Sequence, residues 1–224
     1  AHGVEDPIVW RRQRQPIITV QADVAPGTQA ATITGQLQES LAALRASLPA
    51  GYALEAGGMV EEAAKGNASI IAVVPVTILL MMTLLMIQLR SFTRMAIAMA
   101  LAPFGVIGVV AAMLPTGTPM GFVAQLGVIA LAGMIIRNAV ILIEEADANV
   151  QQGRTPHDAV VDAAMHRCRP ILLTALAAIL GMIPIAGQVF WGPMAYAIVG
   201  GLTAATVLTL SLLPTVLERL LTIE

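Results

Sequence analysis

Charged, aromatic and cysteine residues are all scarce in this sequence. Only 12% of its 224 residues are charged, and 57% are hydrophobic. Charged residues make up about a quarter of a typical soluble domain, so this composition predicts an integral membrane protein that lies in a lipid bilayer. The net charge of −2 is too small to indicate a nucleic-acid partner.

Several chemical motifs are missing as well. Cys168 is the only cysteine, so the chain cannot form an intrachain disulfide, and no redox role is predicted. No glycine-rich phosphate loop, HExxH motif or carboxylate pair occurs within the apolar runs, which argues against ATP-driven and hydrolytic functions. His157 and His166 are nine residues apart, out of phase on a helix, and cannot share a metal ion there. We therefore predict no cofactor, no metal site and no enzyme activity.

The N-terminal residues 1–68 predict a small β-α-β portion. Residues 15–24 alternate apolar and polar side chains like a strand, 31–48 have helical periodicity, and 51–58 form a second short strand closed by glycines. A unit of about 45 residues is too small to bury a core alone, so it requires partner strands from elsewhere. Three arginines at its start are interpreted as solvated surface rather than as an anion site: Arg11, Arg12 and Arg14.

The chain begins at Ala1 without an initiator methionine or signal peptide, so we expect it to be a piece of a longer protein. Its remaining residues, 69–224, predict a transmembrane domain, because five apolar stretches reach the roughly 20 residues that a span requires. The predicted spans are residues 69–89, 95–114, 120–143, 170–189 and 195–216. Residues 155–169 predict a separate amphipathic helix on the membrane face, with Thr155 and Asp158 as its capping box.

Basic residues are unevenly distributed among the short loops. The turns at 115–121 and 188–194 contain none. The other two connections contain five: Arg90, Arg94, Arg154, Arg167 and Arg169. By the positive-inside rule these two connections are cytoplasmic. The rule therefore places residues 1–68 in the periplasm and Glu224 in the cytoplasm.

The third span carries Arg137 within its apolar run. An arginine at mid-span costs about 2.5 to 3.5 kcal/mol, and such residues usually face a bundle interior and serve an ion or substrate pathway. Ala130, Gly133 and Glu144 share its helical face, and small residues there let another helix approach closely. The alternative is that Arg137 snorkels to the membrane surface. We favour a buried functional role.

Two further polar residues are candidates for a site. Asn138 adds a second polar group beside Arg137, or serves only as an interhelical hydrogen-bonding residue. Thr174, in the fourth span, is on its own most simply explained as a hydroxyl bonded to its own helix backbone. Three pairs of small residues predict close helix packing in the last two spans: Ala177 with Gly181, Gly200 with Ala204, and Gly201 with Ala205.

Three segments carry a resemblance to a known family: GVIALAGMIIRNAVILIEE (127–145), RCRPILLTALAAILGMIPIA (167–186) and RRQRQPIITVQADV (11–24). The chain resembles the C-terminal part of a resistance-nodulation-division (RND) efflux pump of the acriflavine-resistance type, over essentially its whole length. The resemblance implies a mostly α membrane protein. Residues 1–68 would be the end of a periplasmic porter domain, and the five spans the last five of twelve.

In that family a basic residue on the tenth helix pairs with acidic residues on the fourth, whose protonation drives transport. The resemblance therefore implies a proton relay containing Arg137, Asn138 and Thr174, with the acidic partners on the missing N-terminal half of the pump. Arg137 stands where the family usually has lysine. Because arginine does not deprotonate, only a role as counter-charge is expected of it.

The resemblance also implies a setting and a cargo. It implies a proton/substrate antiporter of the bacterial inner membrane, a homotrimer, and partners in a periplasmic adaptor and an outer-membrane channel. The heavy-metal branch of the family lacks the basic–Asn pair, so Arg137 with Asn138 favours export of drugs and other small amphiphiles. The alternative is a membrane structural or receptor module, in which Arg137 only fixes helix packing or binds anionic lipid.

Overall fold

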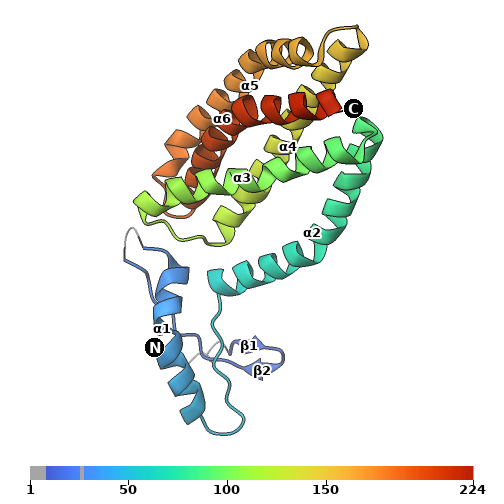
Figure 1. The fold of residues 1–224 in the computed structure, drawn as a ribbon. Coiled ribbons are helices and arrows are strands. Elements are labelled where there is room, and N and C mark those ends of the chain that lie inside the picture. The colour runs from blue at the N-terminus through green and yellow to red at the C-terminus, as the bar shows by residue number, and fades with distance from the viewer. Residues whose placement is uncertain (1–8, 26–27, 224) are drawn as a thin grey trace, which may run out of the picture.

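The computed structural model describes residues 9–25 and 28–223 and shows a mostly helical chain (Figure 1). Its elements in order are β1 (Arg11–Arg12), β2 (Gln15–Pro16), α1 (Ala30–Ser47), α2 (Met59–Leu89), α3 (Phe92–Thr116), α4 (Phe122–Gln151), α5 (Pro156–Ala186) and α6 (Gly192–Ile223). Within the described residues, the five helices α2 to α6 are long and apolar enough to cross a membrane. The predicted fold class is therefore confirmed.

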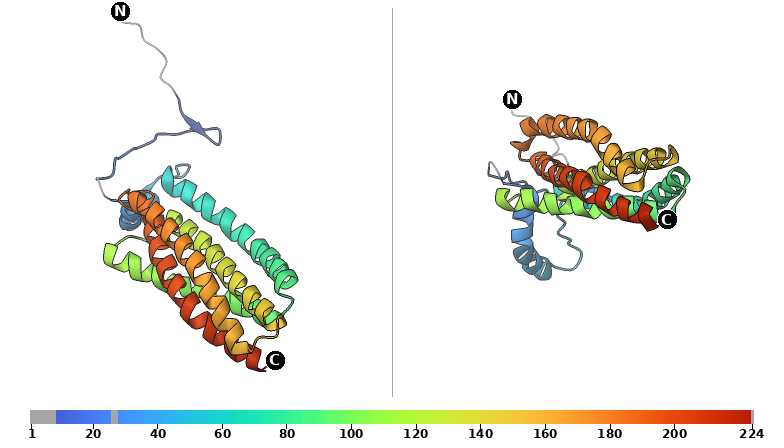
Figure 2. Two further views of the ribbon diagram at one scale, coloured as in Figure 1. Left: turned by 90° about the horizontal axis from the view of Figure 1, so that it is seen from above. Right: turned by 45° about the horizontal axis from the view of Figure 1, so that its top comes forward.

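Helices α3 to α6 pack along one another, and α2 runs beside this group (Figure 2). The core lies where α3, α4 and α6 meet, and its largest fully buried side chains include Val109, Leu131 and Leu213. Gly108 of α3 faces Gly200 of α6 so closely that a Cβ on either glycine would collide with the other's backbone. The close packing predicted for Gly200 is thereby confirmed.

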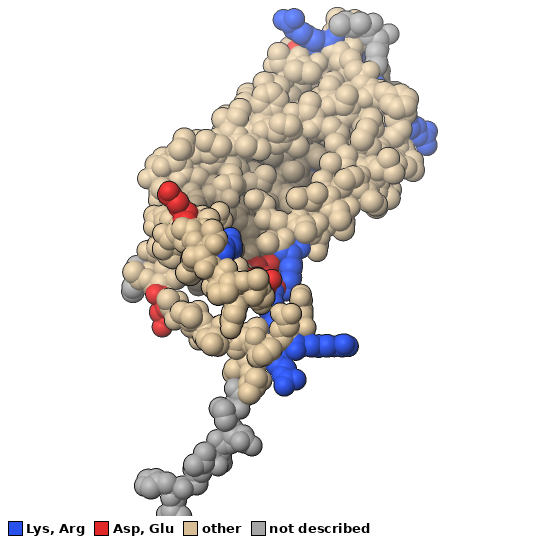
Figure 3. Space-filling view, turned by 90° about the horizontal axis from the view of Figure 1, so that it is seen from below, with Lys and Arg blue, Asp and Glu red and all other residues tan. Residues whose placement is uncertain are grey.

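Turns of different character gather at opposite ends of the helical group (Figure 1). The α2–α3 turn, the α4–α5 turn and the end of α6 lie at one end, which we call the charged end. The α3–α4 and α5–α6 turns lie at the other, uncharged end, near α1. Figure 3 shows an expanse without Lys, Arg, Asp or Glu between charged side chains on the face it presents. The helices thus alternate in direction, as the five predicted spans require.

The observed helices extend beyond the predicted spans. Helix α2 begins at Met59 rather than at residue 69, and α4 continues to Gln151 rather than ending at residue 143. Polar stretches precede the apolar run in α2 and follow it in α4, but both are rich in helix-forming Glu and Ala and continue the helical hydrogen bonds where water is available. Hydrophobicity therefore marked the membrane-length part of each helix and not its ends.

The predicted break between a surface helix at 155–169 and a span at 170–189 is wrong, because α5 is continuous through Pro170. The predicted cap is present, and the Asp158 backbone N–H donates to Thr155 Oγ1 at 3.2 Å. A proline inside a helix leaves one carbonyl without its usual donor. Here that carbonyl belongs to His166, an exposed residue near the charged end, where water can satisfy it.

The N-terminal portion differs most from its prediction. Helix α1 matches the predicted helix at 31–48, but strand structure in 15–24 is confined to Gln15–Pro16, paired antiparallel with Arg11–Arg12. Residues 51–58 form no strand, so the predicted β-α-β order is wrong for this chain. Ile18 and Val20 are 95% and 91% exposed. Strands with apolar side chains in water lack the neighbours that stabilise a sheet, which explains the missing elements.

All three N-terminal arginines are exposed, as predicted, and one of them, Arg12, also makes a specific contact. The Arg12 guanidinium donates to both carboxylate oxygens of Glu61, at 2.9 and 2.7 Å, and lies 3.3 Å from a carboxylate oxygen of Glu55. The bond to Glu61 raises the pKa of Arg12. Arg12 therefore ties the β1–β2 hairpin to the start of α2.

Candidate functional site

Arg137 lies on a face of α4 that this chain leaves uncovered. Its side chain is exposed, as are Ala130 and Gly133 on the same face. No hydrogen bond or ion pair involves the Arg137 side chain within residues 9–25 and 28–223, and a Cβ added to Gly133 would meet open space. The neighbouring helix predicted for this face is therefore not among the described elements.

Asn138 faces the opposite environment. It is 8% exposed, whereas its neighbour Arg137 is exposed, because consecutive helical residues point about 100° apart. Asn138 thus belongs to the packed interior between the helices of this chain. The two adjacent polar residues do not share a surface.

Thr174 lies on an exposed part of α5, and Ala177 and Gly181 beside it are exposed as well. Its hydroxyl donates to the backbone oxygens of Pro170 and Ile171, each at 3.0 Å. This is the intrahelical arrangement expected from the threonine alone. No hydrogen bond joins Thr174, Asn138 and Arg137 in the described part of the chain, so a relay connecting them stays a prediction.

A cluster of charged side chains that was not predicted from the sequence lies where α4 reaches the charged end. Three carboxylates there point in different directions around the helix. Each contacts a different helix: Glu144 accepts a hydrogen bond from Gln88 of α2, Glu145 pairs with Arg167 of α5, and Asp147 pairs with Arg94 of α3. These contacts fasten α4 to the helices around it.

The pair of Arg94 and Asp147 is the more shielded of the two arginine–carboxylate pairs. Arg94 Nη1 lies 2.9 Å from Asp147 Oδ2, and the two side chains are 21% and 16% exposed. Arg167 Nε donates to Glu145 Oε2 at 3.1 Å, and those side chains are 39% and 26% exposed. The signal was present in the sequence, since acidic residues follow the third span on the side where basic loops gather. The sequence pattern indicates the topology of these arginines but not their partners.

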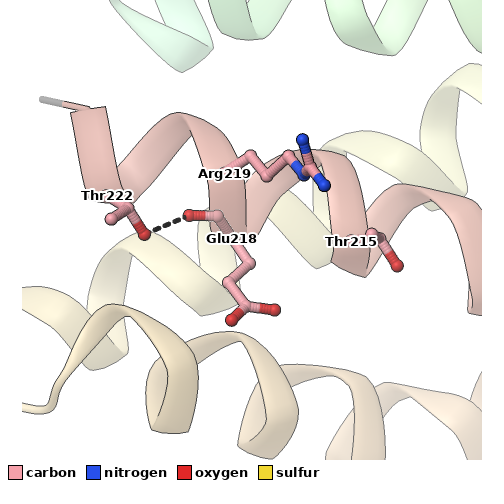
Figure 4. A pocket seen from close by; sticks show the side chains of 4 residues that line it. All are labelled: Thr215, Glu218, Arg219 and Thr222. Carbon is pink, nitrogen blue, oxygen red and sulfur yellow. Dashed lines mark hydrogen bonds between the residues drawn. The ribbon is translucent and has the colours of Figure 1, made fainter.

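The charged end carries two other polar features. His157 Nδ1 of α5 lies 2.9 Å from Glu218 Oε1 of α6. A shallow pocket at the end of α6 is lined by Thr215, Glu218, Arg219 and Thr222 (Figure 4). The Glu218 and Arg219 side chains project to different sides of the helix, and Thr222 donates to the Glu218 backbone oxygen at 2.7 Å. These groups do not converge on a ligand. No cluster of His, Cys, Asp and Glu suited to a metal ion occurs within the residues described.

Five helices long and apolar enough to cross a membrane, one of them with an exposed arginine in its apolar run, define a segment of a multi-pass membrane protein. Residues 3–219 match the model of the AcrB/AcrD/AcrF family, and the chain belongs to that family of RND efflux transporters. The predicted resemblance to an RND pump is thereby confirmed, and so is the coarser statement that the chain is an inner-membrane, multi-pass transporter segment.

Relatives of this chain are named for different resistances. The chain is 33% identical over 179 residues to the nickel-cobalt-cadmium resistance protein NccA of Alcaligenes xylosoxydans xylosoxydans, covering 78% of this chain and 17% of NccA. It is 29% identical over 214 residues to the multidrug resistance protein MdtF of Escherichia coli K12, covering 93% of this chain and 20% of MdtF.

A solved structure agrees with this assignment. The crystal structure of a heavy metal efflux pump (crystal form II) has a TM-score of 0.67 and 28% sequence identity, covering 88% of this chain and 20% of that one. The chain therefore spans about a fifth of the length of the proteins that it matches.

Proposed function

We propose that this chain is the C-terminal part of an exporter driven by the proton-motive force, with Arg137 as the counter-charge of its proton relay. The observation that supports the proposal is the open face of α4. An intramembrane guanidinium is costly without a partner, and Ala130 and Gly133 beside it leave room for another helix. A helix carrying acidic residues, from the N-terminal half of the pump, would cover this face and pair with Arg137.

Each relay residue has a distinct proposed role. Arg137 stabilises the ionised form of the acidic residues, because a nearby positive charge lowers the pKa of a carboxyl group. Protonation of those residues removes their attraction to Arg137. Thr174 presents an exposed hydroxyl that can exchange its backbone bonds for a bond to the relay. Asn138 acts from the packed side of α4, where it helps to fix the helix rather than to carry protons.

The proposed setting follows the family. The intact protein is a homotrimer in the bacterial inner membrane that works with a periplasmic adaptor and an outer-membrane channel. Residues 1–68 are periplasmic, as the end of a porter domain, and the charged end with Glu224 is cytoplasmic. The clustering of the basic loops at one end supports this orientation.

Cysteine labelling tests the orientation. In the intact pump with Cys168→Ser, we expect Thr116→Cys and Gln188→Cys to react with a membrane-impermeant thiol reagent added to spheroplasts, and Gln152→Cys to react only after lysis. All three positions are exposed in the structure, so differences in reactivity report the side of the membrane. Labelling of Gln152→Cys in sealed spheroplasts would reverse the proposed orientation.

For the cargo we propose drugs and other small amphiphiles, on the basis of the Arg137–Asn138 pair. A second candidate is export of divalent metal cations. It is favoured by NccA, which is named for nickel, cobalt and cadmium and is more identical to this chain than MdtF is. Susceptibility of a pump-deficient strain carrying the intact protein separates the two. Protection against dyes but not against nickel or cobalt supports the first, and the reverse result supports the second.

The relay is tested with two substitutions in the intact pump. Arg137→Ala should abolish efflux, because an acidic partner deprived of its counter-charge takes up a proton and remains neutral. Arg137→Lys keeps the charge and should retain part of the activity. Arg219→Ala, at an exposed position at the end of α6, serves as the control and should transport normally. Near-normal efflux by Arg137→Ala, in membranes with matched protein levels, would contradict the proposal and support snorkelling.

A further inference from the structure

Helix α4 is held against its neighbours on both sides of Arg137. Toward the uncharged end, Leu131 and Ile135 are 1% and 2% exposed. A Cβ on Gly105 of α3 would collide with the Ile135 side chain, and one on Gly201 of α6 would collide with that of Leu131. The two large side chains therefore occupy notches that glycines leave open, and this packing fixes α4 before Arg137.

Toward the charged end, the contact between α4 and α3 is the ion pair of Asp147 and Arg94. The pair is short, at 2.9 Å, and both side chains are largely shielded from solvent. A shielded pair is less screened than a surface pair and keeps its geometry better. It thus forms a second fastening, on the other side of Arg137 along the helix.

Helix α3 can fix the position of α4, because α3 is itself held firmly against α6. Its Gly108 lies against Gly200 of α6 with no room for a Cβ on either side, so these two helices cannot slide past each other without a collision. Asp147 lies ten residues beyond Arg137, about 15 Å further along the helix axis at ~1.5 Å per residue. Asp147 faces α3, because it pairs with Arg94, whereas Arg137 lies on the exposed side of α4.

We infer that Arg94 and Asp147 are positioning residues, whose ion pair sets the depth and rotation of Arg137 relative to the acidic residues of the relay. The inference rests on the function proposed above. The other charged or titratable groups at this end are Arg90, Glu144, Glu145, Arg154, His157, Asp158, Asp162, His166, Arg167, Arg169, Glu218 and Arg219. Their ion pairs and hydrogen bonds link α4 to α2 and α5, α5 to the preceding turn, or α5 to α6. Asp147 alone among them pairs with α3.

The test uses the intact pump in proteoliposomes with matched amounts of folded trimer. Asp147→Asn should reduce the maximal rate of dye efflux at least fivefold and leave the KM for dye unchanged, because the cargo pocket is not altered. It should also move the pH of half-maximal transport upward, since a less well-placed Arg137 stabilises the ionised relay acids less. The exchange Arg94→Asp with Asp147→Arg should restore both quantities toward normal.

Matched variants separate this inference from simpler explanations. Glu218→Gln breaks an ion pair at the same end that does not involve α4, and should change neither the rate nor the pH profile. A loss of rate in Asp147→Asn with an unchanged pH profile would mean a purely structural role and would overturn the inference. Normal transport by Asp147→Asn would overturn it as well. If Arg137→Ala abolishes efflux in those same preparations, the proposed function stands even when this inference fails.

Discussion

Two surfaces of this chain that carry glycines differ in whether another helix of the chain packs against them. Where α3 meets α6, Gly108 and Gly200 bring two backbones into contact, and neither position has room for a Cβ. On the exposed faces of α4 and α5, Gly133 and Gly181 have no atom in reach of an added Cβ. The same small residues thus mark a completed contact in one place and an open surface in the other.

The difference shows what a pair of small residues does and does not specify. It provides a flat strip on which a helix can pack closely, but it does not specify which helix occupies that strip. In α6 the partner is α3, which this chain supplies. Next to Arg137 the partner is proposed to be a helix of the missing half. We propose that the exposed glycines of α4 and α5 mark a contact with a helix outside this chain, and substitutions at single positions test this.

The largest effect is expected at the completed contact. Gly200→Leu places a branched side chain where Gly108 and Ala112 of α3 already lie, so the two helices must separate. Overpacking typically costs 1 to 3 kcal/mol, and here the obstacle is backbone, so we expect more than about 3 kcal/mol. The intact pump carrying this change should give little monodisperse protein on size-exclusion chromatography in detergent. A normal yield would show that α3 and α6 are not tightly joined.

A different effect is expected at the open surface. A Cβ added at Gly133 meets no atom of this chain within 4 Å and the position is exposed, so Gly133→Leu should fold and reach the membrane in normal amounts. It should nevertheless lower dye efflux at least tenfold, because the larger side chain keeps the covering helix away from Arg137. Ala111→Leu, at an exposed small residue of α3, is the control and should leave efflux within twofold of normal. Equal efflux by Gly133→Leu and the control would show that this face borders only lipid.

The contrast also explains which parts of the structure could be predicted from the sequence. Long apolar runs are sufficient to predict five spans, and they did so because a helix that crosses lipid satisfies its own backbone hydrogen bonds whatever surrounds it. Strands cannot do this, so the segments 15–24 and 51–58 depended on partners that the pattern of side chains could not supply. The same limit applies to Arg137, whose proposed partner would lie outside this sequence.

Among the site residues, the sequence indicated what is unusual but not what it contacts. An arginine inside an apolar run is conspicuous in itself, and Ala130 and Gly133, which the 3.6-residue period places on its face, are exposed like Arg137. The pair of Arg94 and Asp147 joins positions far apart in the chain, and only the packing of α3 on α4 reveals it. Pro170 led to a wrong prediction of a helix boundary. The helix continues through this proline, because the residues on both sides of it are helical.

An intermediate effect is expected at Asn149, which is a completed polar contact rather than an apolar one. Its side-chain amide donates to the backbone oxygen of Ala159 at 3.0 Å and is buried, so it ties the end of α4 to the start of α5. Asn149→Leu removes this bond, while the Ala159 carbonyl keeps its bond within α5, so the expected cost is about 0.5 to 1.5 kcal/mol. Thermal unfolding of the detergent-solubilised pump should begin at a lower temperature, and Asn149→Asp, which also lacks the donor, should behave alike. An unchanged unfolding temperature in both would mean that water replaces the bond.

The smallest effect is expected where the chain makes a contact in the open. His157 and Glu218 lie 2.9 Å apart, but their side chains are 66% and 41% exposed, so solvent screens the pair. Exposed ion pairs of this kind contribute little to stability, and often nothing measurable. Glu218→Gln keeps the shape of the side chain and should shift the unfolding temperature far less than Asn149→Leu does. The shift should also vanish at high salt, because only the charge has been removed. A loss comparable to that of Asn149→Leu, persisting in high salt, would show that the ends of α5 and α6 are held as firmly as the helices between them.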